Sequence, residues 1–176
     1  MLTFPPLFIW MVLHKEYKKV FRALPWLTGS LLAVLIAAPW YWMAEAKSPG
    51  FLNYFIIGEH FKRFFDSGWK GDLYGFPKQM PLGIIWLFLV AGTLPWIITV
   101  ICRALKNRSQ ILKNRWVSFL FLWMLWTPLF FTVSKSLIHT YVLPVMMPVA
   151  LLVTYWWPDI KNKTVLVYSS LILPFV

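Results

Sequence analysis

The sequence predicts an all-α integral membrane protein. Of its 176 residues, 60% are hydrophobic and only 13% are charged, whereas soluble domains are about half apolar and about a quarter charged. So much apolar surface cannot be buried inside a chain this short, so lipid must cover part of it. The 12 tryptophans support this interpretation, because Trp gathers at membrane interfaces.

Four apolar segments are long enough to cross a bilayer about 30 Å thick, which needs about 20 helical residues. These full spans lie at about residues 26–43, 81–102, 116–133 and 140–157. Two shorter apolar segments, residues 4–13 and 165–176, would be partial helices at the two ends. We therefore expect one transmembrane helical domain over residues 1–176. The partial helices favour a fragment of a larger protein over a small complete one.

Basic residues predict the orientation of these spans. Segments 14–22, 103–115 and 158–163 are rich in Lys and Arg, with only Glu16 and Asp159 as acids. The positive-inside rule makes them cytoplasmic. Residues 44–80 and 134–139 would then be periplasmic, in a multi-pass protein of a bacterial inner membrane. Topology thus explains the net charge of +11, and no nucleic-acid partner is expected.

Residues 44–80 form the longest polar segment, and part of it predicts an amphipathic helix from about Pro49 to Ser67. Ser48 followed by Pro49 is typical of a helix start. Four charged residues would share an arc of about 100°: Glu59, Lys62, Arg63 and Asp66. The opposite face would carry Phe61, Phe64 and Phe65, with His60 at the border. This pattern indicates a periplasmic surface helix that lies on the membrane.

Four residues of this helix are candidates for binding chemistry. Arg63 and Lys62 could hold a lipid-linked phosphate, because Arg forks onto phosphate oxygens and Lys adds a point charge. His60 with Glu59 could ligate a divalent metal ion. Neighbours on a helix diverge by about 100°, so further ligands would have to come from elsewhere. The alternative is a solvated interfacial face that binds nothing.

The turn at residues 134–139 is a second candidate, on the same predicted side of the membrane. Lys135, His139 and Tyr141 lie at a helix entry, where the first N–H groups favour an anion. The alternative is an ordinary hairpin with a snorkelling Lys and an interfacial Tyr. The sequence contains no Gly-rich phosphate loop, nucleophile elbow or His-Glu-x-x-His motif.

Five short motifs follow one another along the chain. They are Pro39-Trp40-Tyr41, Pro49-Gly50-Phe51-Leu52-x-Tyr54-Phe55, Gly58-Glu59-His60-x-x-Arg63-Phe64, Pro95-Trp96 and Thr140-Tyr141-Val142-Leu143-Pro144-x-x-x-Pro148. In order and spacing they resemble bacterial polytopic glycosyltransferases of the aminoarabinose transferase and protein O-mannosyltransferase group, which have the GT-C fold. The resemblance covers nearly the whole chain and corresponds to the C-terminal part of the membrane domain.

The resemblance implies a sugar donor on an undecaprenyl-type phosphate, used at the periplasmic face, and a lipid A-like acceptor. It makes His60 a metal-site residue, places Arg63 near the donor phosphate and lets Tyr141 line the same cavity. Where relatives carry a Lys, this chain has Leu137, with Lys135 two positions earlier. This departure leaves the identity of donor and acceptor open.

A larger departure concerns the catalytic acid. Family members carry a carboxylate in a first periplasmic loop, and this sequence contains no such loop, so no catalytic residue is assigned and no transfer is expected from the chain alone. The alternative is a truncated homologue without activity or a polyprenyl-lipid-binding membrane protein. A small transporter is disfavoured, because no ionisable residue lies in the middle of a full span.

Overall fold

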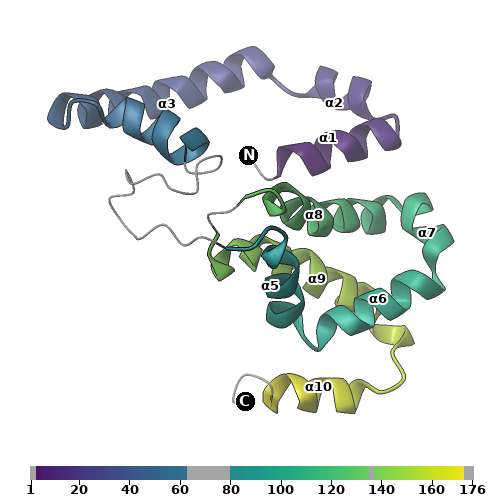
Figure 1. The fold of residues 1–176 in the computed structure, drawn as a ribbon. Helices are drawn as coiled ribbons and strands as arrows, with labels where there is room; N and C mark the ends of the chain where they lie inside the picture. Colours follow the sequence, from purple (N-terminus) through teal and green to yellow (C-terminus); the bar gives the residue numbers. More distant parts are fainter. Residues whose placement is uncertain (1–2, 63–79, 135–136, 173–176) are drawn as a thin grey trace. The chain divides into compact units, whose positions relative to one another are not determined.

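The computed structural model describes residues 3–62, 80–134 and 137–172, and every regular element in these ranges is helical (Figure 1). The prediction of an all-helical chain is confirmed. Two helical segments, Trp26–Lys47 and His139–Asp159, are long and apolar enough to cross a membrane, or three if a bent pair counts as one span. The number of spans therefore stays a prediction.

The chain divides into two compact units. Unit 1 contains Met1–Lys15, Leu82–Val133 and Ile138–Val176, and unit 2 contains Glu16–Pro81 and Ser134–Leu137. Unit 1 holds α1 (Phe4–Leu13), α5 (Ile84–Thr93), α6 (Trp96–Lys106), α7 (Arg108–Lys113), α8 (Arg115–Phe131), η2 (His139–Val142), α9 (Leu143–Trp156), η3 (Trp157–Asp159) and α10 (Lys163–Ile172). Unit 2 holds α2 (Tyr17–Ala23), α3 (Trp26–Lys47) and η1 (Asn53–Lys62).

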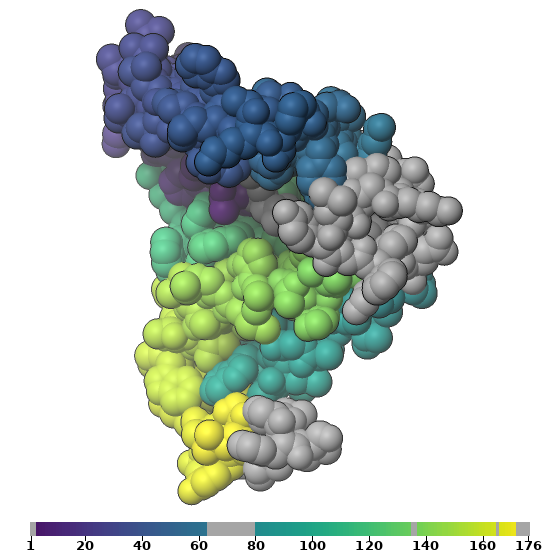
Figure 2. All heavy atoms as spheres, turned by 90° about the vertical axis from the view of Figure 1, so that its left-hand side faces the viewer, coloured from purple at the N-terminus to yellow at the C-terminus, as the bar shows by residue number. Residues whose placement is uncertain are grey.

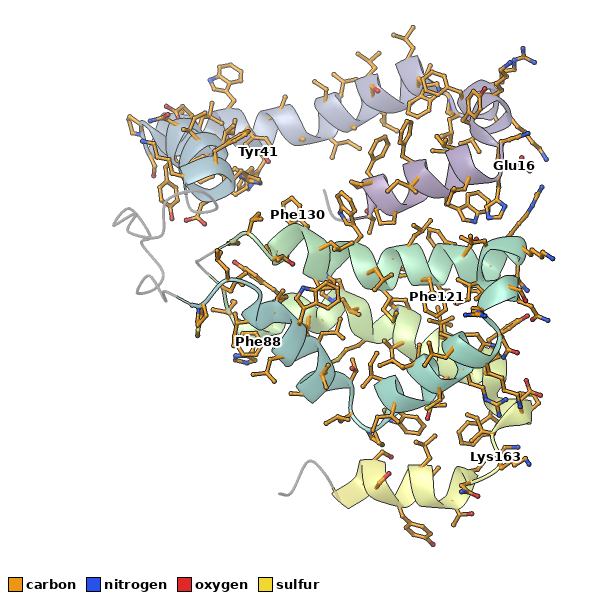
Figure 3. All side chains as sticks on the ribbon, turned by 45° about the vertical axis from the view of Figure 1, so that its right-hand side comes forward. Glu16, Tyr41, Phe88, Phe121, Phe130 and Lys163 are labelled. Carbon is orange, nitrogen blue, oxygen red and sulfur yellow. The ribbon has the colours of Figure 1, made fainter. Side chains whose placement is uncertain are left out.

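The core of unit 1 lies where α8 packs against α9. Leu120 of α8 and Leu152 of α9 are fully buried. Phe121 of α8 contacts Trp156 of α9, with ring centroids 6.1 Å apart (Figure 3). Helix α1 packs on α8 and α6 packs on α9. The apolar side chains of the predicted spans thus bury one another in this unit.

Polar contacts hold the first turn of α8. The Asn114 side chain caps this helix by accepting from the backbone N–H groups of Trp116 at 3.0 Å and Val117 at 3.2 Å. Its amide also donates to the Tyr155 hydroxyl at 2.8 Å, which joins the start of α8 to the end of α9. His14 of α1 lies 2.7 Å from the Ser118 hydroxyl through Nε2. His14 therefore has a structural partner in the helix core.

The predicted span over residues 81–102 is not one straight helix. The structure has α5 and α6 in its place, bent by 101° at the break between them. Pro95 has no N–H to continue the hydrogen bonds of α5. A proline also disfavours a helical conformation at the residue before it, and Leu94 is extended. The other prolines on helix interiors, Pro39, Pro128 and Pro148, interrupt no helix.

Helix α3 of unit 2 starts at Trp26, as the sequence predicts, and ends one turn later than expected, at Lys47. None of its residues is buried within the chain. Apolar side chains project along its whole length (Figure 3) and stand at the surface in the space-filling view (Figure 2, dark blue). Leu27 and Trp42 are 84% and 78% exposed. A helix this apolar and this exposed is expected in lipid.

Thr127 of α8 supports a prediction about stability. Its hydroxyl is fully buried and has no hydrogen-bond partner among the described residues. A Thr127→Val exchange should raise the free energy of unfolding by about 1 kcal/mol, because an unpaired buried polar group is destabilising. Thermal unfolding in detergent measures the change. Thr132→Val is the control and should destabilise, because the Thr132 hydroxyl pairs with Trp86 Nε1 and the Pro128 carbonyl. A loss of stability in Thr127→Val would contradict the prediction.

Candidate functional site

The polar segment after α3 turns at Gly50 and re-enters a helix at Phe51. Gly50 has φ +91°, in the left-handed region that glycine tolerates best. The Glu45 carboxylate holds this turn: Oε1 accepts from the Gly50 N–H and Oε2 from the Leu52 N–H, both at 2.8 Å. The predicted Ser48 cap and Pro49 start are therefore wrong by about two residues. The carboxylate reaches the new helix because the chain reverses after α3.

The segment Asn53–Lys62 is a π-helix, in which residues five apart are hydrogen-bond partners. The predicted surface helix is thus helical here but wound differently from the expected α-helix. Side chains reinforce the wider winding at the same spacing. The Tyr54 hydroxyl donates to Glu59 Oε1 at 2.6 Å, and His60 Nδ1 lies 2.8 Å from the Phe55 carbonyl oxygen. Of the predicted charged arc, Glu59 and Lys62 lie on this π-helix, where α-helical spacing does not hold, and Arg63 and Asp66 lie outside the described residues.

Aromatic side chains join the end of α3 to this π-helix. Trp40 meets Phe51 edge-on at 5.6 Å, and Tyr41 lies 6.0 Å from Phe55. Phe51 and Phe55 are stacked at 5.6 Å, with ring planes 10° apart. Aromatic pairs contribute about 0.5–1.5 kcal/mol each beyond their burial. Four aromatic residues of the first two sequence motifs thus form one cluster that supports the helix carrying His60: Trp40, Tyr41, Phe51 and Phe55.

His60 is exposed, but its ring is held on two sides. Phe55 meets the imidazole edge-on at 5.0 Å and its carbonyl oxygen lies 2.8 Å from Nδ1. A carbonyl oxygen only accepts, so Nδ1 carries the proton in this contact and the lone pair of the neutral ring is on Nε2. The structure therefore presents a ring of defined tautomer with Nε2 available for a proton, a hydrogen bond or a cation.

The other predicted site residues belong to different units of the chain or lie outside the described residues. Glu59 is half-buried and accepts from Tyr54, and Lys62 is exposed. Tyr141 belongs to unit 1, where its ring stacks on Phe131 at 4.7 Å. Arg63, Asp66, the nearby Phe64 and Phe65, and Lys135 lie outside the described residues. The structure thus brings Glu59, His60 and Lys62 together on one helix.

The described part of the chain contains no complete set of ligands for the divalent metal ion that we expected. No three His, Cys, Asp or Glu side chains there lie close enough to hold a metal ion. Glu59 Oε1 accepts a hydrogen bond from Tyr54, and His60 uses Nδ1 toward Phe55. These two residues alone do not make a metal centre, so a divalent metal remains a prediction from the resemblance.

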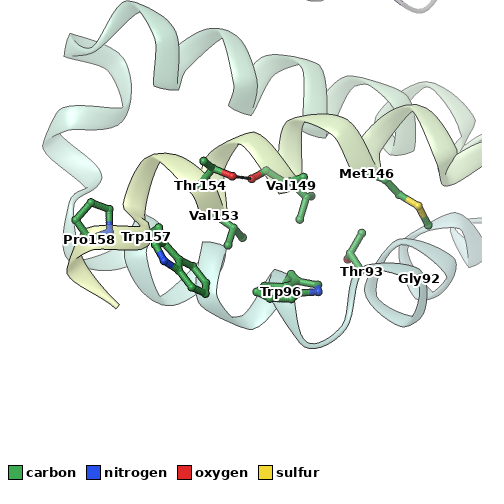
Figure 4. Close-up of a pocket in the computed structure, with 10 residues that line it drawn as sticks. Gly92, Thr93, Trp96, Met146, Val149, Val153, Thr154, Trp157 and Pro158 are labelled. Atoms are coloured by element: carbon green, nitrogen blue, oxygen red, sulfur yellow. Dashed lines mark hydrogen bonds between the residues drawn. The ribbon is translucent and has the colours of Figure 1, made fainter. Parts of the chain in front are cut away.

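Unit 1 contains an apolar cavity of about 670 Å³ beside the α5–α6 bend (Figure 4). Thr93 and Trp96 line it from the bend. Residues that recur on one face of α9 and into η3 form the facing wall: Met146, Val149, Ala150, Val153, Thr154 and Trp157. Their spacing of three and four is visible in the sequence, but that pattern does not distinguish a cavity wall from a packed or lipid-facing surface.

Comparison with curated proteins finds sequence relatives of this chain. The chain is 31% identical over 150 residues to the undecaprenyl phosphate-α-4-amino-4-deoxy-L-arabinose arabinosyl transferase of Pectobacterium carotovorum, covering 82% of this chain. It is 29% identical over 150 residues to the Pseudomonas fluorescens protein of the same name with the numeral 2, and this match covers 85% of this chain. The chain is homologous to one part of these arabinosyl transferases.

The homology to the arabinosyl transferases confirms the family resemblance of the ordered motifs. The match to the Yersinia enterocolitica transferase is 30% identical over 131 residues and covers 74% of this chain. The chain spans about a quarter of the length of these relatives, between 22% and 26%. No family model and no solved structure matches it.

Proposed function

We propose that this chain is part of a membrane glycosyltransferase that moves a sugar from a polyprenyl-phosphate donor to a lipid acceptor of the lipid A type. The observation that carries the proposal is the 150-residue similarity to transferases named for an undecaprenyl phosphate-linked aminoarabinose. The apolar helices fit such an enzyme, because both substrates are anchored in a membrane.

The polar segment supplies the chemistry expected near a leaving phosphate. In the transfer, an acceptor oxygen bonds to the anomeric carbon while the bond from that carbon to the donor phosphate oxygen breaks. Negative charge then gathers on the polyprenyl phosphate, and cationic side chains stabilise it. Lys62, which follows Phe61 on the π-helix that carries His60, is exposed. The proposal assigns binding of the donor phosphate to Lys62 together with Arg63, Lys135 and Tyr141.

Beside these donor-phosphate residues, His60 is proposed to hold a metal ion or handle a proton at the reacting end. Its Nε2 is free of the Phe55 contact, which holds the ring through Nδ1. No carboxylate of this chain is assigned as the base that activates the acceptor. The proposal therefore includes the expectation that the 176-residue chain alone transfers no sugar.

A chimaera tests the transferase proposal. The matching 150 residues of the Pectobacterium carotovorum transferase are replaced by those of this chain, and sugar transfer to lipid A is measured in membranes. The proposal expects transfer by the chimaera and none by the chain alone. A chimaera that reaches the membrane at the level of the parent enzyme but transfers nothing contradicts it. Donor binding without transfer would favour the alternative, a polyprenyl-lipid-binding protein without activity.

Donor binding can also be measured on the chain itself. Membranes containing it are exposed to a photoreactive polyprenyl phosphate, and labelling of the protein is quantified. Lys62→Ala should lower labelling roughly two- to fivefold, the scale of an exposed ion pair. Lys113→Ala is the matched control, because Lys113 is also exposed but lies on the opposite predicted side of the membrane. Equal losses in both variants would mean unspecific attraction and would contradict a site at Lys62.

The proposed orientation has its own test. In a Cys102→Ser background, Asn53→Cys and Lys106→Cys each introduce one thiol at an exposed position. A maleimide that cannot cross the inner membrane should label Cys at position 53 in spheroplasts and label Cys at position 106 only after the membrane is opened. The reverse pattern would place residues 44–80 in the cytoplasm.

A further inference from the structure

A lysine lies against the wall of the apolar cavity. Lys163, the first residue of α10, places Nζ 5.7 Å from the centroid of the Trp157 ring. Trp157 itself lines the cavity. The face of an indole ring attracts a cation at this distance. The Lys163 ammonium group therefore lies at one end of the apolar cavity, over the Trp157 ring that forms part of the cavity wall.

The cavity offers few hydrogen-bonding groups to a ligand. Its two hydroxyl side chains are already used within their own helices: Thr154 donates to the Ala150 carbonyl at 2.9 Å (Figure 4), and Thr93 donates to the Leu89 carbonyl. The remaining wall is aliphatic, aromatic or sulfur-containing. A volume of about 670 Å³ lies within the roughly 300–1,000 Å³ of ligand sites. The chemistry therefore suits a hydrocarbon chain.

Charge at the Lys163 end favours an anion beside that hydrocarbon. Lys161 lies between η3 and α10 and Lys163 begins α10, while Asp159 at the end of η3 is the acid of this region. Helix α6, which contributes Trp96 to the cavity, ends with Arg103 and Lys106 in its last turn. The positive-inside rule places these basic ends together on the cytoplasmic side. Basic pockets between helices on that side suit anionic phospholipid head groups.

We propose that this cavity holds an acyl chain of an anionic phospholipid whose phosphate pairs with Lys163. The lipid is distinct from the sugar donor, because the donor phosphate is proposed at the opposite, periplasmic face with Lys62. An uncharged or zwitterionic lipid would gain less from the cation over Trp157. The proposal goes beyond sugar transfer, because it concerns a lipid bound to unit 1 whether or not the chain takes part in catalysis.

Native mass spectrometry of the full chain in mild detergent tests this proposal with phosphatidylglycerol and phosphatidylcholine as probes. Phosphatidylglycerol should bind more tightly, and Lys163→Ala should remove about fivefold of that preference, the effect of one basic residue near a charged headgroup. Ala150→Phe should abolish binding of both lipids, because Ala150 lines the cavity. Ala37→Phe is the matched control on exposed α3 and should leave binding unchanged.

A second measurement does not depend on the folding of Ala150→Phe. One equivalent of phosphatidylglycerol with brominated acyl chains should quench tryptophan fluorescence in detergent. The absolute loss of fluorescence should fall in Trp96→Phe, whose parent residue lines the cavity, and stay unchanged in Trp42→Phe, whose parent residue lies on α3. Equal affinity for the two lipids, or a preference that survives Lys163→Ala, would overturn the proposal. Two further results would also overturn it. One is displacement of phosphatidylglycerol by equimolar undecaprenyl phosphate. The other is a dimer that forms without lipid and that Ala150→Phe disrupts.

Discussion

Replacing His60 with alanine is expected to lower sugar transfer by the chimaeric transferase at least about 100-fold, the usual contribution of a side chain that exchanges a proton with the reacting groups. The expectation comes from the geometry of the ring. Nδ1 faces the Phe55 carbonyl, so Nε2 is the atom left for chemistry. Initial rates of transfer to lipid A, measured at equal protein levels in membranes, give the effect.

A His60→Asn variant separates the two nitrogen atoms of the imidazole. The asparagine amide can replace the Nδ1–H donor toward Phe55 but has no counterpart of Nε2. We expect His60→Asn to unfold at the parent temperature and to lose as much activity as His60→Ala. Full activity in the asparagine variant would mean that His60 only supports the π-helix. Phe61→Ala is the control beside it, because Phe61 is 51% exposed and should leave transfer nearly unchanged.

The second large effect concerns the stability of unit 1. Leu152→Ala is expected to lower the free energy of unfolding by about 2–3 kcal/mol, the lower part of the range for buried leucines. Leu152 is fully buried in α9, which packs on α8. The effect should not reach the upper part of that range, because lipid is as apolar as leucine and the transfer contribution shrinks in a membrane. Most of the loss would come from the cavity that remains.

Met147→Ala is the matched control on the same helix. Methionine is close to leucine in size, but Met147 is 57% exposed, so its truncation should change stability by less than about 0.5 kcal/mol. Unfolding by a denaturing detergent, followed by tryptophan fluorescence, measures both variants. Similar losses in the two variants would contradict the packing of α9 on α8.

The local pattern of the sequence predicts much of this fold. Apolar composition alone indicates helices in a membrane, and Trp26 is predicted correctly as the start of α3. The order of the short motifs indicates the transferase family that the comparisons confirm. We expected one span over residues 81–102; the missing N–H of Pro95 explains a break there, but it does not set the bend of 101°.

The candidate site is less predictable, because its contacts join residues at spacings of five and seven that α-helical periodicity does not predict. Residues 51–62 of the polar stretch are helical as predicted, yet α-helical spacing predicts the wrong winding for Asn53–Lys62. The pairs Tyr54–Glu59 and Phe55–His60, five residues apart, belong to the wider winding. The capping role of Glu45 exists only because the chain reverses at Gly50, which the local sequence pattern does not show.

The sequence by itself determined the membrane class, the helical character and the family, because these depend on composition, on the length of apolar segments and on the order of short motifs. The tertiary structure alone decided which side-chain and backbone groups face one another. It directed His60 Nδ1 to the Phe55 carbonyl, and it placed the α5–α6 bend against one face of α9 to form the cavity. The physical reason is that hydrogen bonds and cavities need groups brought together in space, whereas composition and periodicity act within a segment.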